Sequence, residues 1–356
     1  MGQFEVAVIG AGQAGLAAGK ALQDAGIDFV MIDGAQRIGD SWRSRFDSLR
    51  LFSPRSLSAL PGMPLPGPDQ VYPTKDEIAD YLEAYARQFS LPVRLATRAT
   101  SLGQYNGGFR IDVSTGPQIH SRAVLIAAGA FQVPNRPAMA CNLAPNILQL
   151  DGTSYKNPAQ LPEGRVLVVG SGATGRQIAK EVGAARETWL ACGSPAIISP
   201  HRVLGRDMMW WAKVSGLLTA DKDTLRGRLA RRHDSFPGPE LSDKALRRTG
   251  IRLVGRAVKA SAKRITFACG IEQEFRAVIW ATGYRDDSSW IGIEGALHHG
   301  AILEDRGISP VPGLYYVGRS WQKSRASALL CGVGREAEEV VAQLRQYVRC
   351  PQGERS

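Results

Sequence analysis

Short apolar runs alternate with amphipathic stretches along much of this chain. Residues 6–9 form an apolar run that predicts a strand, residues 16–25 predict a helix, and residues 29–32 predict a second strand. The same succession returns later, where residues 165–169 predict a strand, residues 176–185 a helix and residues 187–191 the next strand. Strands that alternate with helices in this way favour an α/β fold with parallel sheets.

A glycine-rich turn follows the first predicted strand. It reads Gly10-Ala11-Gly12-Gln13-Ala14-Gly15 and has the spacing GxGxxG. In such a turn Gly10 allows the tight bend, Gly12 lets the backbone approach a pyrophosphate, and Gly15 lets helix and strand pack closely. The helix start supplies free N–H groups to the phosphates. Asp33 ends the second strand, where it can accept hydrogen bonds from a ribose, so the unit predicts a dinucleotide site.

A second turn of the same kind follows the later strand. It reads Gly170-Ser171-Gly172-Ala173-Thr174-Gly175, but no acid ends the next strand, where Cys192-Gly193-Ser194 stands. A carboxylate there would repel a ribose 2′-phosphate, whereas serine and arginine favour one, and Arg202 lies downstream. The second unit therefore predicts NADPH rather than NADH.

Two dinucleotide units in one chain indicate a hydride donor and a hydride acceptor. A nicotinamide nucleotide supplies the hydride and a flavin accepts it. The first unit, with its ribose acid, suits the ADP half of FAD.

Further motifs resemble the flavin-containing monooxygenase-like group of flavoproteins with two dinucleotide-binding domains, which includes the plant YUCCA monooxygenases. The resemblance covers nearly the whole chain. It is carried by Gly39-Asp40-Ser41-Trp42-Arg43, Leu49-Arg50-Leu51-Phe52-Ser53-Pro54, Ala127-Ala128-Gly129-Ala130-Phe131, Ala281-Thr282-Gly283-Tyr284, Gly313-Leu314-Tyr315-Tyr316-Val317-Gly318 and Gly332-Val333-Gly334-Arg335-Glu336-Ala337.

The resemblance implies an α/β fold of two Rossmann-like dinucleotide-binding domains of the three-layer ββα type. The NADPH domain, residues 158–283, would be inserted into an FAD domain made of residues 1–157 and 284–356. Three short segments at 93–95, 109–113 and 123–126 predict an antiparallel meander on the first domain.

The turns and the resemblance together define the candidate cofactor-binding residues. For FAD these are Gly10, Gly12, Gln13, Ala14, Gly15, Asp33, Gly39, Trp42, Arg50, Ser53, Gly129, Gly318 and Gly332. For NADPH they are Gly170, Ser171, Gly172, Ala173, Thr174, Gly175, Arg202 and Gly283. Near the flavin the resemblance also places Lys75, Arg319, Trp321 and Gln322, and it identifies no catalytic acid or base.

The family's reaction is a monooxygenation, and the resemblance implies it here. NADPH would reduce FAD, the reduced flavin would activate O2 as a C4a-(hydro)peroxyflavin, and a small organic substrate would be oxygenated. One motif departs from the family. Asp151 stands where an FxGxxxH-type fingerprint would have its histidine, although Tyr155 matches the aromatic end. An NADPH-dependent FAD oxidoreductase without oxygen insertion therefore stays open, as does a flavin-binding regulatory protein without turnover.

Charge is concentrated in one part of the 356 residues. The chain has 44 Lys and Arg against 33 Asp and Glu, a net charge of +11, and residues 200–270 alone hold 16 basic against six acidic residues. A polyanion or the phosphates of a dinucleotide would explain this excess. The arginine runs at 226–232 and 247–248 contain no aromatic residue, so we expect no nucleic-acid partner and instead a small-molecule substrate and O2.

Cysteine spacing and hydropathy exclude further classes of protein. Five cysteines include no CxxC pair, which disfavours a metal site and the dithiol centre of thioredoxin reductases. Residues 6–9 are too short for a signal-peptide core, and no run approaches the roughly 18 apolar residues of a membrane span. We expect a cytoplasmic protein without stable membrane insertion. A homodimer stays open, because the apolar stretch at 207–218 fits core packing, a substrate entrance or a dimer surface.

Overall fold

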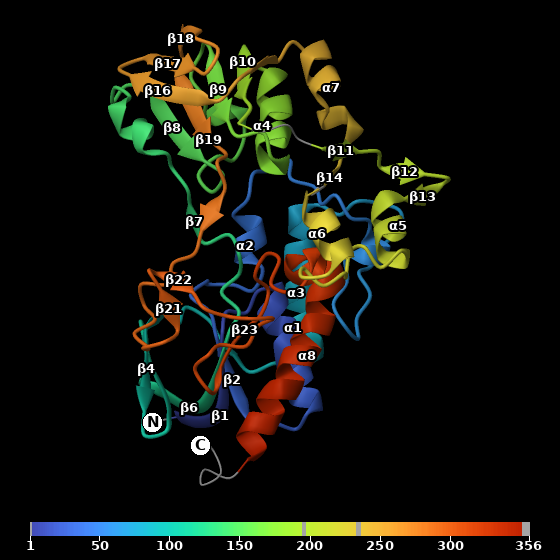
Figure 1. Cartoon of the computed structure of the whole chain (residues 1–356), viewed down its shortest axis with the longest axis vertical. Coiled ribbons are helices and arrows are strands. Elements are labelled where there is room, and N and C mark those ends of the chain that lie inside the picture. Colours follow the sequence, from blue (N-terminus) through green and yellow to red (C-terminus); the bar gives the residue numbers. More distant parts are fainter. Residues whose placement is uncertain (1, 194–196, 233–235, 351–356) are drawn as a thin grey trace.

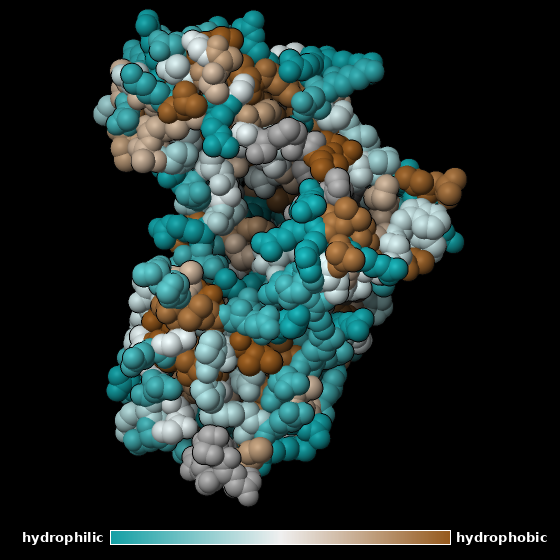
Figure 2. Space-filling model, viewed as in Figure 1, coloured by the Kyte–Doolittle hydropathy of each residue, from teal (hydrophilic) through white to brown (hydrophobic). Residues whose placement is uncertain are grey.

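Two sheets, one mixed and one parallel, organise the chain into an upper and a lower lobe (Figure 1). The computed structural model describes residues 2–193, 197–232 and 236–350. The first lobe, built from both ends of the chain, lies below in Figure 1, and the second lobe lies above it. Two extended crossings join them, and Figure 2 shows the surface hollowed between the lobes.

The first lobe is built on a seven-stranded sheet. Its order is β3-β2-β1-β6-β5-β4, and β23 pairs with the second half of β6. Strands β1, β2, β3, β6 and β23 run parallel, whereas β4, β5 and β6 form antiparallel pairs. The strands are β1 (Gly2–Ile9), β2 (Phe29–Ile32), β3 (Val93–Arg94), β4 (Ala99–Tyr105), β5 (Gly108–Val113), β6 (Ile119–Ile126) and β23 (Leu314–Tyr316).

Three helices cover one face of this sheet. They are α1 (Gln13–Asp24), α3 (Lys75–Gln88) and the C-terminal α8 (Leu330–Arg349). Their apolar stripes form one core with alternate residues of the sheet, such as Val8 and Met31. The other alternate residues pack with β4 and β5, which makes this lobe three-layered. Every residue of β2 is buried, as expected of a parallel strand covered on both faces.

The second lobe repeats this arrangement on a five-stranded parallel sheet. Its order is β15-β10-β9-β19-β8, and the strands are β8 (Leu148–Asp151), β9 (Val166–Val169), β10 (Thr188–Ala191), β15 (Arg252–Val254) and β19 (Ala277–Trp280). Helices α4 (Ala173–Gly183) and α7 (Asp243–Arg248) pack on one face. The other face carries an antiparallel layer of β16 (Ala257–Ser261), β17 (Arg264–Phe267) and β18 (Glu272–Glu274).

The fold class predicted from the sequence is therefore confirmed, because each lobe stacks a parallel sheet between helices and an antiparallel layer. The domain boundaries stay a prediction. Strand β8 lies within residues 1–157, yet it pairs with β19 in the second sheet (Leu148↔Ala277).

One expected element was wrong. The predicted meander used the segment at 93–95, but β3 pairs in parallel with β2, and the meander is β4-β5-β6 instead. In β4 only Leu102 is buried, so this strand lacks the apolar alternation that would have revealed it.

A small subdomain extends from the second lobe over the first. It contains α5 (Met208–Val214), α6 (Leu225–Arg232), the hairpin of β12 (Arg202–Val203) and β13 (Arg206–Asp207), and β11 (Ile198–Ser199) paired with β14 (Phe236–Pro237). Met209 and Leu218 pack on Leu57 and Ala326 of the first lobe, so part of the apolar stretch is core. Leu204 and Leu225 are more than 80% exposed, and Figure 2 shows apolar surface over these elements.

The remaining short elements connect these units. They are α2 (Asp40–Arg43), the crossing strands β7 (Val133–Pro134) and β20 (Tyr284–Arg285), and the hairpin of β21 (Leu297–His298) and β22 (Ala301–Ile302).

Candidate functional site

The first glycine-rich turn joins β1 to α1 and contains two glycines that no other residue could replace without strain. Gly10 has a φ of +108°, and a Cβ on it would lie 2.5 Å from the Ala127 carbonyl oxygen. A Cβ on Gly15 would lie 1.9 Å from the Gly10 oxygen. Gly12 differs, because nothing lies within 4 Å of where its Cβ would be. Gly10 and Gly15 close the turn, and Gly12 leaves its backbone open to a ligand.

Asp33 lies at the carboxyl end of β2, beside this turn. Its Oδ2 accepts a hydrogen bond from the Ala11 amide at 2.6 Å, and its Oδ1 accepts one from the Ala35 amide at 2.8 Å. Each carboxylate oxygen has a second acceptor site. The two amides therefore fix the side chain and leave it able to accept from the hydroxyl groups of a ribose.

The C-terminal segment meets the first turn from the other end of the chain. A Cβ on Gly318 would lie 2.4 Å from the Cβ of Ala14, and the Gln13 side chain donates to the Ala328 carbonyl at 2.7 Å. Ala328 ends the short helix Arg325–Ala328 that precedes α8. Gly332, in the first turn of α8, packs against it, because its Cβ would lie 2.2 Å from that of Ala326. Four predicted FAD residues, Gln13, Ala14, Gly318 and Gly332, thus come together from positions more than 300 residues apart.

The four residues predicted to contact the flavin between positions 39 and 53 all contact other parts of the protein. Gly39 has a φ of +88° and caps α2 against Ala79 of α3. Trp42 is half-buried against the core of the first lobe. The Arg50 guanidinium donates to the Tyr72 carbonyl at 3.3 Å, and buried Ser53 lies 2.8 Å from the Ser58 hydroxyl. The roles of these four residues toward a flavin stay predictions.

The second turn joins β9 to α4 and repeats the first in detail. Gly170 has a φ of +112°, and its Cβ would lie 2.2 Å from the Ala281 oxygen. The Cβ of Gly175 would lie 1.8 Å from the Gly170 oxygen, and again nothing lies within 4 Å of a Cβ on Gly172. The second unit therefore offers the same open backbone at the start of its helix.

The second unit lacks the acid that follows the second strand of the first unit. Cys192 follows β10, and burial raises the pKa of its thiol. Ser194 lies outside the described residues. Arg202 is on β12, close to Tyr72. Burial and the hydrogen bond to Asp207 raise the pKa of Tyr72, and the positive charge of Arg202 counteracts part of that rise. The described contacts thus connect Arg202 with Tyr72 rather than with the end of β10.

The two crossings between the lobes run side by side. Strands β7 and β20 pair antiparallel, and the Asn135 amide donates to the Gly283 carbonyl at 2.9 Å. Gly129 and Gly283 occupy corresponding places, with φ of +78° and +87° and nothing within 4 Å of a Cβ. Each predicted crossing glycine therefore presents bare backbone at the junction.

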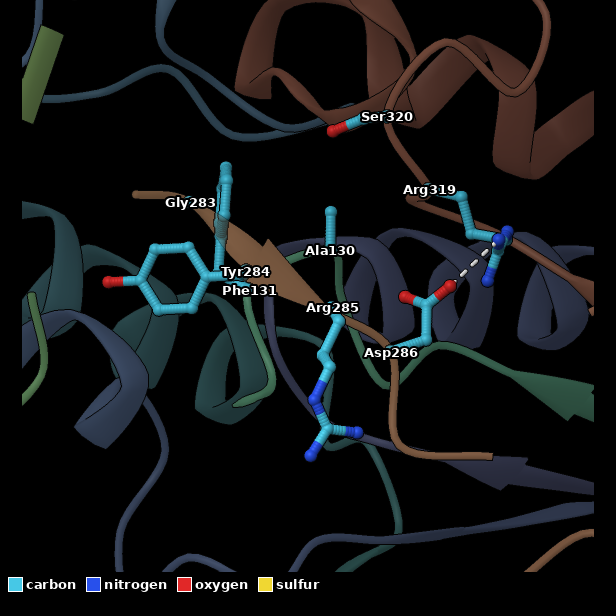
Figure 3. A pocket seen from close by; sticks show the side chains of 8 residues that line it. All are labelled: Ala130, Phe131, Gly283, Tyr284, Arg285, Asp286, Arg319 and Ser320. Carbon is cyan, nitrogen blue, oxygen red and sulfur yellow. Dashed lines mark ion pairs between the residues drawn. The ribbon is translucent and has the colours of Figure 1, made fainter. Parts of the chain in front are cut away.

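A pocket of about 310 Å³ lies at this junction and is shown in Figure 3. Asp286 and Arg319 form an ion pair of 3.0 Å on one side, and Tyr284 points the other way. This junction pocket is lined by Ala130, Phe131, Gly283, Tyr284, Arg285, Asp286, Arg319 and Ser320. It is bounded by both crossings and by the segment that follows β23.

Arg45 from the first lobe closes one side of the junction. Its Nη1 donates to the Tyr284 hydroxyl at 2.7 Å, and its guanidinium lies 5.6 Å from the ring centre of Phe131 and 5.2 Å from that of Tyr284. These distances allow cation–π attraction to both rings. Sequence reasoning missed Arg45, because only the folded chain brings it to residues 131 and 284.

Asp151, at the position of the missing fingerprint histidine, forms an anchored ion pair. Arg136 donates to its Oδ2 at 2.6 Å, and the Thr153 hydroxyl donates to its Oδ1 at 2.6 Å. Burial opposes ionisation, but the bonds from Thr153 and Arg136 outweigh it and lower the Asp151 pKa. A Cβ on neighbouring Gly152 would lie 2.7 Å from the Tyr284 hydroxyl. The segment therefore lies against the junction, with a fixed carboxylate in place of an imidazole.

Metal clusters, membrane-spanning helices and disulfide bonds are absent from the described part of the chain. Residues 2–193, 197–232 and 236–350 contain no group of three or more His, Cys, Asp or Glu that could hold a metal ion. No helix within those ranges is long and apolar enough to cross a membrane. All five cysteines lie in the described ranges, and no two of them form a disulfide bond with each other.

Proteins of similar sequence and fold are flavin-linked oxidoreductases. The family model for pyridine nucleotide-disulphide oxidoreductases matches residues 7–188. An uncharacterized CzcO-like oxidoreductase of Geobacillus kaustophilus is 42% identical over 95% of this chain and 97% of its own. Indole-3-pyruvate monooxygenase YUCCA1 of Oryza sativa is 26% identical over 87% of this chain and 85% of its own. A flavin-containing monooxygenase from Stenotrophomonas maltophilia superposes with a TM-score of 0.83 and 29% identity, covering 98% and 99% of the two chains.

The chain belongs to the pyridine nucleotide-disulphide oxidoreductase family. Within that family it is one of the flavin-containing monooxygenase-like flavoproteins, as the sequence motifs predicted, and it is an oxidoreductase. Members of this class work with a flavin and a pyridine nucleotide. The dithiol chemistry in the family name needs paired cysteines, and this chain has no CxxC.

Proposed function

We propose that this protein binds FAD at the first turn and NADPH at the second, and that it is a monooxygenase of a small organic substrate. The observation that carries the proposal is the match between the two turns. Gly12 and Gly172 both present open backbone at a helix start, and only the first unit adds a ribose acid, Asp33. Bound FAD would supply the redox chemistry, by accepting a hydride and reacting with O2.

The chain's own groups would hold the flavin at three places. The amides at the start of α1 face the open side of Gly12, where a pyrophosphate would be attracted by the helix dipole. Asp33 would accept from ribose hydroxyls. The first turn of α8 contains no acid, so its N-terminus can stabilise negative charge on a reduced ring system.

At the junction pocket the chain would shape the meeting place of the two nucleotides. The crossings carry Gly129 and Gly283, whose bare backbone allows close approach of a flat ring. The hydrogen bond from Arg45 to Tyr284 fixes both side chains, so they can line the junction without moving when a ligand enters. The small-molecule substrate and O2 would reach the flavin through this region.

One observation favours the alternative of a reductase without oxygen insertion. Asp151, bound to Arg136, replaces the histidine of a fingerprint that marks oxygen-activating members. A carboxylate held in an ion pair donates no hydrogen bond, whereas an imidazole can. The similarity to monooxygenases over nearly the full chain still favours oxygen insertion.

The test is anaerobic reduction of the FAD-loaded protein with NADPH, followed by mixing with oxygenated buffer. Monooxygenase chemistry predicts bleaching and then a transient near-ultraviolet band before the oxidised spectrum returns. Direct return to the oxidised spectrum, with one H2O2 formed for each NADPH used, supports the reductase. Flavin that NADPH does not bleach contradicts both enzymes.

A further inference from the structure

The carboxyl end of β10 is the place where the second unit would meet the ribose of its nucleotide. Cys192 and Gly193 stand there, and neither has a side chain that can pair with a phosphate. The thiol of Cys192 is half-buried, and burial raises its pKa, so it is neutral at pH 7. Any charge that recognises a 2′-phosphate must therefore come from another element.

The neighbouring strand supplies that element. Strand β15 runs parallel to β10, with Ala191 opposite Val254, and the Cys192 amide donates to the Val254 carbonyl at 2.9 Å. The chain that leaves β15 thus runs beside the chain that leaves β10. Arg256 follows two residues after β15, and its Nε and Nη2 lie 3.6 Å and 3.8 Å from the place of a Cβ on Gly193. The guanidinium takes the position beside β10 that a longer side chain at residue 193 would fill.

Two other arginines near this strand end are already engaged. Arg176 is 1% exposed and donates to the Ser171 and Leu241 carbonyls, while its Nη2 pairs with Asp243 at 2.7 Å. Arg252 lies 4.7 Å above the ring of Trp189. Arg256 is exposed, and within the described residues no carboxylate lies within ion-pair distance of it.

We propose that Arg256 recognises the ribose 2′-phosphate and thereby selects NADPH over NADH. A guanidinium presents a planar fork of donors that fits two phosphate oxygens at once. The inference rests on the proposed nucleotide site at the second turn, and it transfers to Arg256 the role that the sequence suggested for Arg202. Arg202 lies beside Tyr72, on the hairpin that projects to the right in Figure 1.

The experiment compares two nucleotide fragments by calorimetry on the FAD-loaded full chain. The fragment 2′,5′-ADP carries the 2′-phosphate, and 5′-AMP lacks it. We expect Arg256→Ala to weaken 2′,5′-ADP at least tenfold and to change 5′-AMP by less than twofold. Arg256→Lys keeps the charge but loses the fork, so it should restore part of the affinity.

Two variants serve as matched controls. Arg247→Ala removes another exposed arginine whose charge acts on Cys192, and Arg202→Ala removes the residue named from the sequence. Both should leave the preference for 2′,5′-ADP intact. The inference is overturned if either control loses the preference for 2′,5′-ADP while Arg256→Ala keeps it. It is also overturned if Arg256→Ala weakens the binding of both fragments equally.

The wild-type protein separates this inference from the proposed function. Wild-type protein that binds both fragments equally contradicts selection by Arg256 but leaves the nucleotide site in place. Wild-type protein that binds neither fragment contradicts the site and the inference together.

Discussion

The two lobes build the same turn, yet they surround it with different chemistry. In both, the first glycine has φ near +110° and lies against the residue that follows a neighbouring strand, Ala127 after β6 or Ala281 after β19. The last glycine of each turn packs on the first, and the middle one faces open space. After the second strand the lobes diverge, because Asp33 accepts from two backbone amides in the first lobe, whereas Arg256 lies beside Gly193 in the second. In the function we propose, the glycines would set where a pyrophosphate can approach, and the residues at the next strand end would set which ribose is accepted.

The largest expected effect comes from filling the open side of each turn. Gly12 and Gly172 have φ of −76° and −71°, so valine fits the backbone and only a ligand is excluded. Gly12→Val should weaken FAD about 1000-fold, equivalent to about 4 kcal/mol, and give colourless protein. Gly172→Val should stay yellow and lose reduction by NADPH. Flavin content and stopped-flow bleaching measure both, and loss of the same ligand in both variants contradicts two separate sites.

Stability should change equally in the two turns when the strained glycines are replaced. A Cβ on Gly10 would lie 2.5 Å from the Ala127 carbonyl oxygen, and a Cβ on Gly170 would lie 2.2 Å from that of Ala281. Each alanine variant should lower the free energy of unfolding by about 3 kcal/mol, measured by urea denaturation of flavin-free protein. Gly116→Ala is the control, since Gly116 has φ of +92° but open space, and it should cost about 1 kcal/mol. Unequal losses at residues 10 and 170 indicate that the turns differ.

Placing the acid of the first unit in the second should change nucleotide choice. Cys192→Asp puts a carboxylate where a 2′-phosphate would lie, so the ratio of kcat/KM for NADPH to that for NADH should fall about tenfold. Cys192→Ser keeps a small neutral side chain and should leave the ratio unchanged. A ratio that Cys192→Asp does not alter argues that the ribose lies elsewhere.

The smallest effect concerns the ion pair at the junction. Asp151 has a pKa below its usual 3.8, so its charged form stabilises the fold above that pH, and this stabilisation is lost as the pH falls toward the lowered folded value. Asp151→Asn should cost about 1 kcal/mol at pH 7, since Arg136 is half-exposed and solvent screens the pair. The difference between the two proteins in urea denaturation should shrink at pH 3. A difference that is equally large at both pH values contradicts an ionised Asp151.

Local sequence patterns were enough to predict the two glycine-rich turns and the fold class. The spacing of Gly10, Gly12 and Gly15 predicts both the tight bend and the open backbone at the helix start. The structure shows the same geometry in the turn that begins at Gly170. The pairing of β4 was hidden, because only Leu102 in that strand is buried. Sheet register could be inferred for apolar strands and not for this mostly exposed one.

Contacts that depend on distant pairing could not be predicted. Arg45 meets Tyr284 across 239 residues, and Arg256 reaches Gly193 only because β15 lies beside β10. No local spacing signals either contact. Arg202 drew attention through its nearness to Cys192 in the sequence, whereas the hairpin of β12 and β13 carries it to Tyr72.

We propose above all that a nucleotide bound at the second turn delivers a hydride to a flavin held by the first. Anaerobic stopped-flow reduction with NADPH deuterated in turn on each face of nicotinamide C4 tests it most directly. We expect rapid bleaching of bound FAD, slowed at least about twofold by deuterium on one face alone, and abolished in Gly172→Val. Bleaching without an isotope effect on either face, or equally fast bleaching in Gly172→Val, would contradict direct transfer between the two units.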